Sequence, residues 1–514
     1  MVYAFELLFH MYEERGYRER EIPELILTKN LAGMEIDSRA AQIAELALAM
    51  CAREHDRRFF RRGVRADVTV LSSIPLGEDE LPGNKKLAEE LSHLGEIGSL
   101  LNPSEDEIDE LKAAAASCSD DLFAATAKTK LESAAAICEK LSRRFTCTVA
   151  NPPYMGSSSF NPFMSKWIKK NYPDVKSDLF SSFVVRMFKF AKDHGECGVM
   201  SPFVWMFIGS YEKLRNEIIN DRTLTSLIQL EYSGFAGATV PICSYTFHNS
   251  FIKGYKGGYV RLSDFVGAAA QAPKALEAIQ NPDCGWFYRR DAEAFRQIPG
   301  TPIAYWLGKG ANGSFEVGRP LAKIAKTRKG MFTGNNDLFL RQWYEVSASL
   351  IDIDYKFYSK GGPYRRWYGN RDYVVRWKDD GKEIKAFPGS GNINESDYFR
   401  SCLCWSLITS GDISFRALNT DEYVMGDAGP ACYPNPEMYW YLLGLLNSSA
   451  IQLLSKAINP TLNWSAGVVG SFPVVSSRES SDGVKSLVVK QVVESEADWD
   501  SFETSWDFKR NPLV

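Results

Sequence analysis

The residues Asn151, Pro152, Pro153 and Tyr154 stand directly after a segment with the composition of a β-strand. That segment, 145–150, is rich in β-branched and aromatic residues, which favour a short strand. The two prolines have no backbone N–H groups to donate, so the strand must end at Asn151. Because ligands in open α/β sheets bind beyond the carboxyl ends of the strands, we expect these four residues to form a binding site.

Asn151, Pro152 and Tyr154 together are suited to chemistry on the amine of a nucleobase. Such an amine is a poor nucleophile because its lone pair is delocalised into the ring. Two acceptors beside it, the Asn151 side-chain oxygen and the Pro152 carbonyl, favour a tetrahedral nitrogen that can attack. Tyr154 can stack on a base that has been turned out of the duplex, and alignment with a methyl donor then needs no metal. The alternative is a plain Pro-Pro turn, in which Asn151 forms the turn and Tyr154 packs nearby.

The elements that must position this site alternate between strands and helices up to about residue 266. Before the site, the apolar spacing predicts a helix over 1–15 that stops at Gly16, followed by a strand over 30–36. A helix capped by Asp37 or Ser38 is predicted next, then a strand within 60–70 and mainly helix over 86–142. After the site it predicts a helix over 177–196, a strand over 197–205, a helix over 210–219, a strand over 224–232 and a hairpin of 239–251 with 257–265. Alternation of this kind predicts an α/β domain with a mostly parallel sheet and an antiparallel edge.

The remainder of the chain differs in composition. The segment 267–320 has an irregular pattern and is predicted to connect two domains. Residues 321–478 are richer in Gly, Trp and Tyr, and 321–380 hold 12 Lys and Arg against 7 Asp and Glu, which predicts a separate domain with a local basic surface. Residues 479–514 are polar and are predicted to begin a C-terminal helical region. The uncharged run 438–455 contains several polar residues, which favours a buried helix over a membrane span.

The composition is that of a soluble globular protein with two or three domains: 514 residues, of which 45% are apolar, 24% charged and 13% aromatic. The net charge of −4 provides no overall basic field for nucleic acid. Ten cysteines and five scattered histidines show no metal-site spacing, and a single residue separates Cys402 from Cys404. We therefore predict reduced thiols, no metal and no membrane segment, in a cytoplasmic protein.

With these features the sequence resembles a γ-class DNA adenine-N6 methyltransferase. It looks most like the large methyltransferase of phage-defence systems of the phage-growth-limitation (BREX) type, and type IIG restriction–modification enzymes look similar. The NPPY segment at 151–154 matches the family's catalytic motif, in which the Asn and the prolyl carbonyl contact the target amine and the Tyr stacks on the base.

The resemblance covers nearly the whole chain. It implies a Rossmann-like methyltransferase sheet over 1–266, followed after the connecting segment by an α+β target-recognition domain over 321–478. It also implies methyl transfer from S-adenosylmethionine to the N6 amine of adenine in double-stranded DNA, in a phage-defence or restriction–modification context.

Two further motifs imply residues that bind S-adenosylmethionine. LAGMEID matches the acidic motif at the end of the family's second strand, so Glu35 would bind the ribose hydroxyls and Ile36 would touch the adenine of the donor. SDLFSSF resembles an Asp-Leu-Tyr/Phe motif, so Asp178 and Phe180 would line the donor pocket. The alternatives are a solvated strand-end acid for Glu35 and a helix N-cap for Asp178.

Other segments imply contacts with DNA. GFAGATVP resembles the segment that carries a second aromatic residue, so Phe235 would stack on the flipped base; the alternative is that Phe235 is a core residue. KGGPYRRWYGN lies in the region that resembles the target-recognition domain and would place Arg365, Arg366 and Trp367 near DNA. Arginine clamps phosphate or reads guanine edges, whereas the alternative here is a solvated charged loop.

The sequence departs from the family at its beginning. The family carries a glycine-rich loop, which cradles the methionine part of the donor, just before the helix over 1–15. Neither this loop nor the strand before it stands in the sequence, and no convincing third donor-binding motif occurs between 60 and 150. The missing strand would lie between the strands that end at Glu35 and Asn151, so we expect two exposed sheet edges and a hydrophobic slot.

A catalytic domain that is incomplete in this way leaves two functions open. The first is an adenine methyltransferase whose partners are double-stranded DNA and either other subunits of a phage-defence complex or a separate N-terminal polypeptide. The second is an inactive or split-enzyme fragment that acts only as a DNA-recognition module. A weaker third interpretation is an N4-cytosine methyltransferase, in which the motif usually begins with Ser or Asp rather than Asn.

Overall fold

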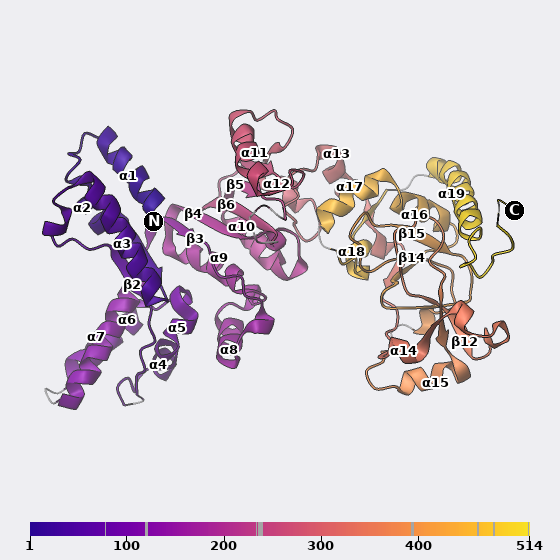
Figure 1. Cartoon of the computed structure of the whole chain (residues 1–514), viewed down its shortest axis with the longest axis horizontal. Helices are drawn as coiled ribbons and strands as arrows, with labels where there is room; N and C mark the ends of the chain where they lie inside the picture. Colours follow the sequence, from indigo (N-terminus) through magenta and orange to yellow (C-terminus); the bar gives the residue numbers. More distant parts are fainter. Residues whose placement is uncertain are drawn as a thin grey trace. The chain divides into compact units, whose positions relative to one another are not determined.

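The computed structural model divides into two compact units (Figure 1). The first comprises Met1–Ser201 with Ser244–Phe251, and the second comprises Pro202–Cys243 with Ile252–Val514. The residues described are 1–77, 79–118, 122–232, 234, 240–391, 395–459, 462–475, 478–511 and 513. The functional domain limits inferred from the sequence, at 266, 320 and 478, stay predictions.

The first unit begins with helices that enclose a small core. Its first elements are α1 (Val2–Glu14), α2 (Ile22–Leu25), a π-helical turn (Ile26–Asn30), β1 (Ala32–Glu35), α3 (Ser38–His55) and β2 (Asp67–Val70). The chain turns after α1 at Gly16, whose φ of +81° lies in the left-handed region that glycine tolerates. Asp37 caps α3 with its side chain, and the buried rings of Phe5 and Phe9 from α1 lie in the same core as α3.

β1 and β2 form a separate two-stranded sheet. They pair in parallel, with Ala32 opposite Asp67 and Glu35 opposite Val70. The strands predicted within 30–36 and 60–70 are therefore confirmed, although both are shorter than the segments expected. The π-helical turn extends to Asn30 and so delays the start of β1.

The helices between β2 and the site are α4 (Lys85–Ser92), α5 (Leu94–Ile97), α6 (Glu105–Ser117) and α7 (Leu122–Ser142). Two basic residues at the end of α7 hold it against β2. Lys140 Nζ lies 2.7 Å, and Arg143 Nη1 2.6 Å, from carboxylate oxygens of Asp67. β3 (Phe145–Ala150) follows and confirms the strand predicted before the site.

A six-stranded sheet has the order β3-β4-β6-β5-β7-β8. After β3 its strands are β4 (Ala191–Pro202), β5 (Thr223–Gln229), β6 (Ile242–His248), β7 (Gly257–Arg261) and β8 (Phe287–Arg290), and the helices among them are α8 (Pro162–Asn171), α9 (Leu179–Phe190) and α10 (Glu212–Asp221). β3 pairs in parallel with β4 and β5 pairs in parallel with β7, whereas β7 and β8 are antiparallel. The expected parallel sheet with an antiparallel edge is confirmed.

The hairpin predicted from 239–251 and 257–265 is wrong. β6 and β7 are consecutive in the chain, but β5 lies between them in the sheet. The chain does not turn back directly after β6, because the buried Asn249 donates its side-chain N–H groups to the carbonyls of Phe188 and Ala191. These bonds anchor the end of β6 to the end of α9, and periodicity alone could not indicate them.

β1 and β3 each have one unpaired edge among the described residues. β1 pairs only with β2, and β3 pairs only with β4. Parallel strands are normally covered on both faces, yet the apolar side chain of Val149 in β3 is 81% exposed. The expected edges of a single sheet on either side of one missing strand stay a prediction, because β1 and β3 belong to different sheets.

The segment 267–320, for which no regular pattern was expected, contains defined elements. Besides β8 it forms α11 (Ala268–Gln280), α12 (Ala292–Arg296), α13 (Lys309–Val317) and β9 (Arg319–Pro320). The sequence pattern did not reveal the two longer helices because both carry poor helix formers, and the connecting role of the segment stays a prediction. Pro273 lies inside α11, and two glycines, Gly310 and Gly313, lie inside α13.

Two four-stranded sheets form the next part of the second unit. One has the order β10-β17-β14-β15, from Lys326–Arg328, Ala431–Tyr433, Cys402–Trp405 and Phe415–Leu418. The other has the order β11-β13-β12-β16, from Leu340–Gln342, Tyr373–Arg376, Tyr355–Ser359 and Tyr423–Met425. The short helices α14 (Asn336–Phe339) and α15 (Lys378–Ala386) accompany them.

The uncharged run 438–455 forms most of two helices, α16 (Tyr439–Leu446) and α17 (Ser449–Ile458), whose Leu442 and Leu443 are fully buried. This confirms a buried helical segment, and no described helix is long and apolar enough to cross a membrane. α18 (Ala466–Gly470), β18 (Pro473–Val474) and α19 (Arg478–Trp499) complete the fold, and α19 confirms the predicted C-terminal helix.

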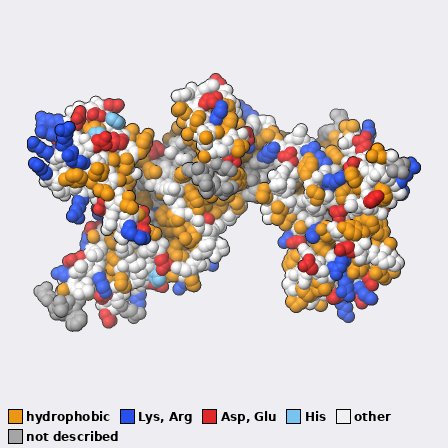
Figure 2. All heavy atoms as spheres, in the orientation of Figure 1, with side chains coloured by type: hydrophobic (Ala, Val, Ile, Leu, Met, Phe, Trp, Pro, Cys, Tyr) orange, Lys and Arg blue, Asp and Glu red, His pale blue; other side chains and the backbone are white. Residues whose placement is uncertain are grey.

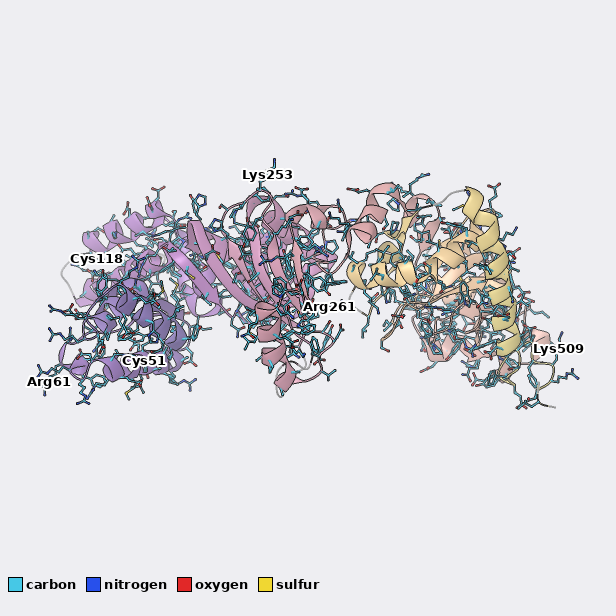
Figure 3. All side chains as sticks on the ribbon, turned by 90° about the horizontal axis from the view of Figure 1, so that it is seen from above. Cys51, Arg61, Cys118, Lys253, Arg261 and Lys509 are labelled. Atoms are coloured by element: carbon cyan, nitrogen blue, oxygen red, sulfur yellow. The ribbon has the colours of Figure 1, made fainter. Side chains whose placement is uncertain are left out.

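All ten cysteines are free thiols, and Cys51 and Cys118 in the first unit are marked in Figure 3. Charged side chains cover both units (Figure 2). Their distribution is uneven, with a dense group of Lys and Arg at one end of the first unit.

Candidate active site

The NPPY turn follows β3 directly and brings Asn151 and Tyr154 into contact. The Tyr154 hydroxyl donates a hydrogen bond to Asn151 Oδ1 at 2.9 Å. Pro152 is buried and fixes the turn, whereas Asn151 is exposed and the Tyr154 side chain is 39% exposed. In the described part of the chain no group donates to the Pro152 carbonyl. Two acceptor oxygens and an accessible aromatic ring therefore stand at the end of one strand.

Asp178 holds the segment that follows this turn. Its Oδ1 accepts the backbone N–H of Met155 at 3.2 Å and that of Phe180 at 3.2 Å. Leu179 N–H donates to the Met155 carbonyl at 2.9 Å, and Gly156 forms an antiparallel bridge with Asp178. One carboxylate thus caps α9 and also fixes the backbone just beyond Tyr154.

Burial raises the pKa of Asp178, although the backbone N–H donors from Phe180 and Met155 act in the opposite direction. Asp178 is half-buried, and the Phe180 ring is fully buried in the core. The N-cap alternative for Asp178 is what the structure shows. A role of Asp178 and Phe180 in donor binding stays a prediction.

Glu35 ends β1 with its carboxylate held in one orientation. Its Oε1 accepts the backbone N–H groups of Ile36 at 2.8 Å and Asp37 at 3.0 Å. Among the described residues nothing donates to Oε2, so this oxygen is available to a ligand hydroxyl. Ile36 is 53% exposed, which leaves an apolar side chain next to the carboxylate. The roles of Glu35 and Ile36 in binding the ribose and adenine of the donor stay predictions.

Phe235, the predicted second stacking residue, lies outside the described residues, as do its neighbours on the C-terminal side up to 239. Its role stays a prediction. Among the described residues, no group of His, Cys, Asp and Glu side chains is arranged to hold a metal ion.

The predicted DNA-contacting segment forms a tight loop in the second unit. Trp367 has a φ of +72°, which is rare for an aromatic residue, and its N–H donates to the Phe415 carbonyl at 2.9 Å. Asn370 closes the loop through a 2.9 Å hydrogen bond to the Pro363 carbonyl. A backbone conformation of this kind persists only where its surroundings hold it in place.

The arginines of this loop have different environments. Arg365 Nη1 lies 3.2 Å from Asp498 Oδ2, and its guanidinium lies 4.8 Å from the centre of the Trp499 ring. Arg366 stands over the Tyr364 ring, and its Nε has no hydrogen-bond partner in the part of the chain described here. The sequence could not reveal the partners of Arg365, because α19 lies more than a hundred residues further on.

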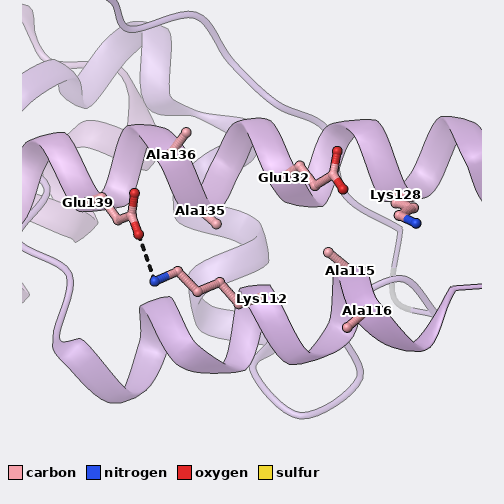
Figure 4. A pocket seen from close by; sticks show the side chains of 8 residues that line it. All are labelled: Lys112, Ala115, Ala116, Lys128, Glu132, Ala135, Ala136 and Glu139. Atoms are coloured by element: carbon pink, nitrogen blue, oxygen red, sulfur yellow. Dashed lines mark ion pairs between the residues drawn. The ribbon is translucent and has the colours of Figure 1, made fainter.

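A groove of about 470 Å³ between α6 and α7 is separate from this site (Figure 4). It is lined by alanines and charged side chains, and Lys112 Nζ pairs with Glu139 Oε1 at 2.6 Å across it. Such a lining offers a stable helix pair rather than a set of reactive groups.

Comparison with known proteins places these features in context. Residues 29–235 match the model of the Eco57I restriction-modification methylase family. The chain is 31% identical, over its whole length, to the adenine-specific methyltransferase PglX of Lacticaseibacillus casei (strain Zhang). It is also 31% identical, over 99% of its length, to the adenine-specific methyltransferase BrxX of Escherichia coli O9:H4 (strain HS). The chain spans about half the length of these curated relatives, 46% of each.

Solved structures resemble the fold at low sequence identity. A nuclease-deletion mutant of the type ISP restriction-modification enzyme LlaGI, in complex with a DNA substrate mimic, gives a TM-score of 0.54 at 12% identity over 96% of this chain and 43% of that chain. The type IIL restriction-modification enzyme MmeI in complex with DNA gives a TM-score of 0.52 at 11% identity over 95% of this chain and 64% of that chain. At such identities the likeness shows the fold alone, which the chain shares with these two restriction-modification enzymes.

The NPPY turn and the acidic end of β1 both lie within the matched residues 29–235. Residues 29–235 of the chain are therefore similar to the Eco57I restriction-modification methylase family, and the chain is similar along its whole length to the adenine-specific methyltransferases PglX and BrxX.

Proposed function

We propose that this chain transfers a methyl group from S-adenosylmethionine to the N6 amine of adenine in double-stranded DNA. The observation that carries the proposal is the turn after β3, where Asn151 Oδ1 and the Pro152 carbonyl are both available beside an accessible Tyr154 ring. The similarity to adenine-specific methyltransferases over the whole chain supports the same activity.

The geometry suits an amine with two N–H groups. Asn151 Oδ1 has two lone pairs, of which Tyr154 occupies one, so the other can accept from the target amine. The Pro152 carbonyl accepts the second N–H. These two bonds draw the nitrogen towards tetrahedral geometry and expose its lone pair. The Tyr154 ring stacks on the flipped base and holds it in line.

Glu35 is the residue that we assign to the methyl donor. When bound, S-adenosylmethionine supplies the methyl group that the amine accepts. Glu35 Oε2 accepts from the ribose hydroxyls, while the backbone N–H groups of Ile36 and Asp37 hold Oε1 in place. Asp178 and Phe180 support the other side of the pocket, and no metal takes part.

The context that we propose is phage defence or restriction–modification, in the cytoplasm where the DNA is. The partners are double-stranded DNA and other subunits of a defence complex. Residues 1–266 would form the catalytic domain, and 267–320 would connect it to the target-recognition domain. Residues 321–478 would recognise the target, with Arg365, Arg366 and Trp367 near DNA, and 479–514 would begin a helical region.

Asn151→Ala tests the assignment directly. It removes the side-chain acceptor but leaves the turn, so we expect methyl transfer to a DNA duplex to be lost while duplex affinity changes less than about twofold. Transfer of labelled methyl groups and fluorescence anisotropy measure the two quantities on the same preparation. An equal loss of both would remove Asn151 from the catalytic role.

A second candidate function is a DNA-recognition module that lacks activity by itself. The strand pairing favours it, because Glu35 ends a strand of the two-stranded sheet whereas Asn151 follows a strand of the six-stranded sheet, and no strand pairing among the described residues joins the two sheets. Isothermal titration of the folded chain with S-adenosylmethionine separates the two functions. Micromolar binding supports the enzyme, whereas absence of binding by a folded chain that still binds DNA supports the module.

A further inference from the structure

A dense group of arginines covers one end of the first unit, outside the site described above (Figure 2). It comes from two segments, 15–20 and 53–65, in which nine Arg stand against three acidic residues and no Lys occurs. We call the exposed members the arginine cluster: Arg15, Arg18, Arg20, Arg57, Arg58, Arg61, Arg62 and Arg65. Arg61 is marked at the edge of the unit in Figure 3.

Direct contacts join the two segments. Arg62 Nη1 lies 3.0 Å from Glu24 Oε2, and Arg62 Nη2 donates to the Arg20 carbonyl at 3.0 Å. The turn after α1 and the loop after α3 therefore form one continuous basic surface.

Buried residues hold the loop in one conformation. Phe59 is 2% exposed and belongs to the core between α1 and α3. Asp56 is 7% exposed, accepts the Arg58 N–H at 3.0 Å and pairs with Arg62 Nε at 2.9 Å. The arginines around these anchors are presented on a fixed backbone, so a partner does not have to order the loop.

Most of this positive charge is not neutralised by the protein. Arg18 pairs with Glu21, and Arg62 pairs with Glu24 and Asp56. Within the described ranges the remaining six members of the cluster form no ion pair: Arg15, Arg20, Arg57, Arg58, Arg61 and Arg65. This concentration stands out in a chain whose net charge is −4. Uncompensated like charges repel one another, which indicates an anionic partner.

We propose that the arginine cluster binds the phosphate backbone of double-stranded DNA without regard to sequence. The proposal rests on the proposed function and adds to it a DNA-binding surface apart from the loop of Arg365, Arg366 and Trp367. Guanidinium groups make paired hydrogen bonds to phosphate, which suits a surface built from Arg alone.

The secondary structure around the arginine cluster favours contact with the DNA phosphate backbone over base reading in a groove or binding to a lipid surface. Its members stand on turns and on the short 3-10 segment Phe59–Arg61, not on a long helix or a β-ribbon that could enter the major groove. A lipid surface would favour arginines on an amphipathic helix with a broad apolar face, whereas within segments 15–20 and 53–65 the exposed large apolar side chains are Tyr17 and Phe60. Contact with phosphates along a duplex fits both observations.

The triple variant Arg57→Gln, Arg58→Gln, Arg61→Gln tests the proposal in the full chain. These side chains are exposed and unpaired, so the fold should be kept, which circular dichroism checks. The probe is a fluorescent duplex of random sequence, titrated between about 50 and 200 mM salt. We expect the Kd to rise about tenfold or more, and the slope of log K against log salt to fall by about 2–3.

A matched control removes the same charge elsewhere in the first unit. Lys169→Gln, Lys170→Gln, Lys192→Gln changes three exposed lysines outside the cluster. This control should keep the duplex affinity within about threefold. Equal weakening by both triples would overturn the proposal, because net charge would then explain the binding. An unchanged salt slope in the arginine triple would overturn it as well.

Two more arms distinguish the source of the phosphate and the role of catalysis. Vesicles that contain phosphatidylglycerol should bind the natural chain no better than the triple arginine variant. If the triple variant lost affinity for vesicles but kept its affinity for the duplex, the proposal would be overturned. Asn151→Ala should keep the cluster-dependent duplex binding. If the natural chain failed to transfer methyl groups, the result would count against the proposed function, whereas the test of duplex binding by the arginine cluster would still hold.

Discussion

At the scale of single residues, the Tyr154 hydroxyl is part of the site as well as the Tyr154 ring. It donates to Asn151 Oδ1 at 2.9 Å and so orients the amide to which we assign the target amine. The motif suggested only stacking for this residue. Tyr154 thus combines an aromatic surface with a hydrogen bond that positions its neighbour, and the two contributions can be measured separately.

Tyr154→Phe keeps the ring and removes only the hydroxyl. One hydrogen bond contributes about 1 kcal/mol, so we expect kcat/KM for DNA methylation to fall less than about tenfold. Tyr154→Ala also removes the stacking surface, which contributes about 1–3 kcal/mol more, so its loss should be about 10- to 100-fold larger. Steady-state methylation kinetics measure both, and equal losses would contradict a stacking role for the ring.

Glu35 and Asp37 are neighbouring carboxylates with different expected roles. Glu35→Gln removes the charge and one acceptor, so we expect the Kd for S-adenosylmethionine to rise about tenfold or more. Asp37→Asn is the matched control, because Asn also caps helices well and α3 should be kept. Isothermal titration compares the two. Donor binding that is unaffected by Glu35→Gln would favour the solvated strand-end acid.

At the scale of elements, a carboxylate on β2 connects this strand to the end of α7, the helix that leads into β3. Burial opposes ionisation of Asp67, but the hydrogen bonds from Lys140 and Arg143 outweigh it, and the pKa of Asp67 lies below its ordinary value. The position of β3 relative to β2 therefore depends on a charge that acid can remove.

A lowered pKa means that ionised Asp67 stabilises the folded state above its ordinary pKa of about 4. This contribution is lost as the pH falls through the lower, folded-state pKa. We expect Asp67→Asn to reduce the free energy of unfolding by about 1–2 kcal/mol at neutral pH and by less in acid. Denaturant unfolding at several pH values measures the difference, and a difference that grows as the pH falls would contradict the assigned ion pairs.

At the scale of the whole molecule, a net charge of −4 means that DNA binding must come from local basic surfaces. The loop of Arg365, Arg366 and Trp367 in the second unit is one candidate. Arg365 already pairs with Asp498, whereas Arg366 forms no ion pair among the residues described. The charge of Arg366 is therefore less compensated by the protein than that of Arg365.

Arg366→Ala should weaken duplex binding and lower the salt slope by about one, as the loss of a single phosphate contact does. Arg376→Ala is a control in the same unit, because the Arg376 side chain is partly exposed and pairs with Glu383. Fluorescence anisotropy over a series of salt concentrations measures both variants. Unchanged binding by Arg366→Ala at moderate salt would exclude this loop from the DNA surface.

Local sequence patterns predicted most helices and strands well, but they predicted poorly which strands lie next to each other in a sheet. The strand 145–150 and the Asp37 cap follow from residue types within a few positions, because strand propensity, proline and capping act locally. The order β6-β5-β7 and the short helices of 267–320 were missed. Strand order depends on contacts such as that of Asn249 with the end of α9, which no local pattern encodes.

The sequence by itself determined the chemistry of this protein: the NPPY turn at the end of a strand and an acid at the end of another, each placed by local backbone preferences. Only the tertiary structure decided what those residues touch. It showed that Tyr154 orients Asn151, that Asp178 fixes the backbone of Met155, and that Arg62 joins two distant segments into one basic surface. Hydrogen bonds and ion pairs between remote segments form only when the chain is folded, and so they cannot be read from spacing along it.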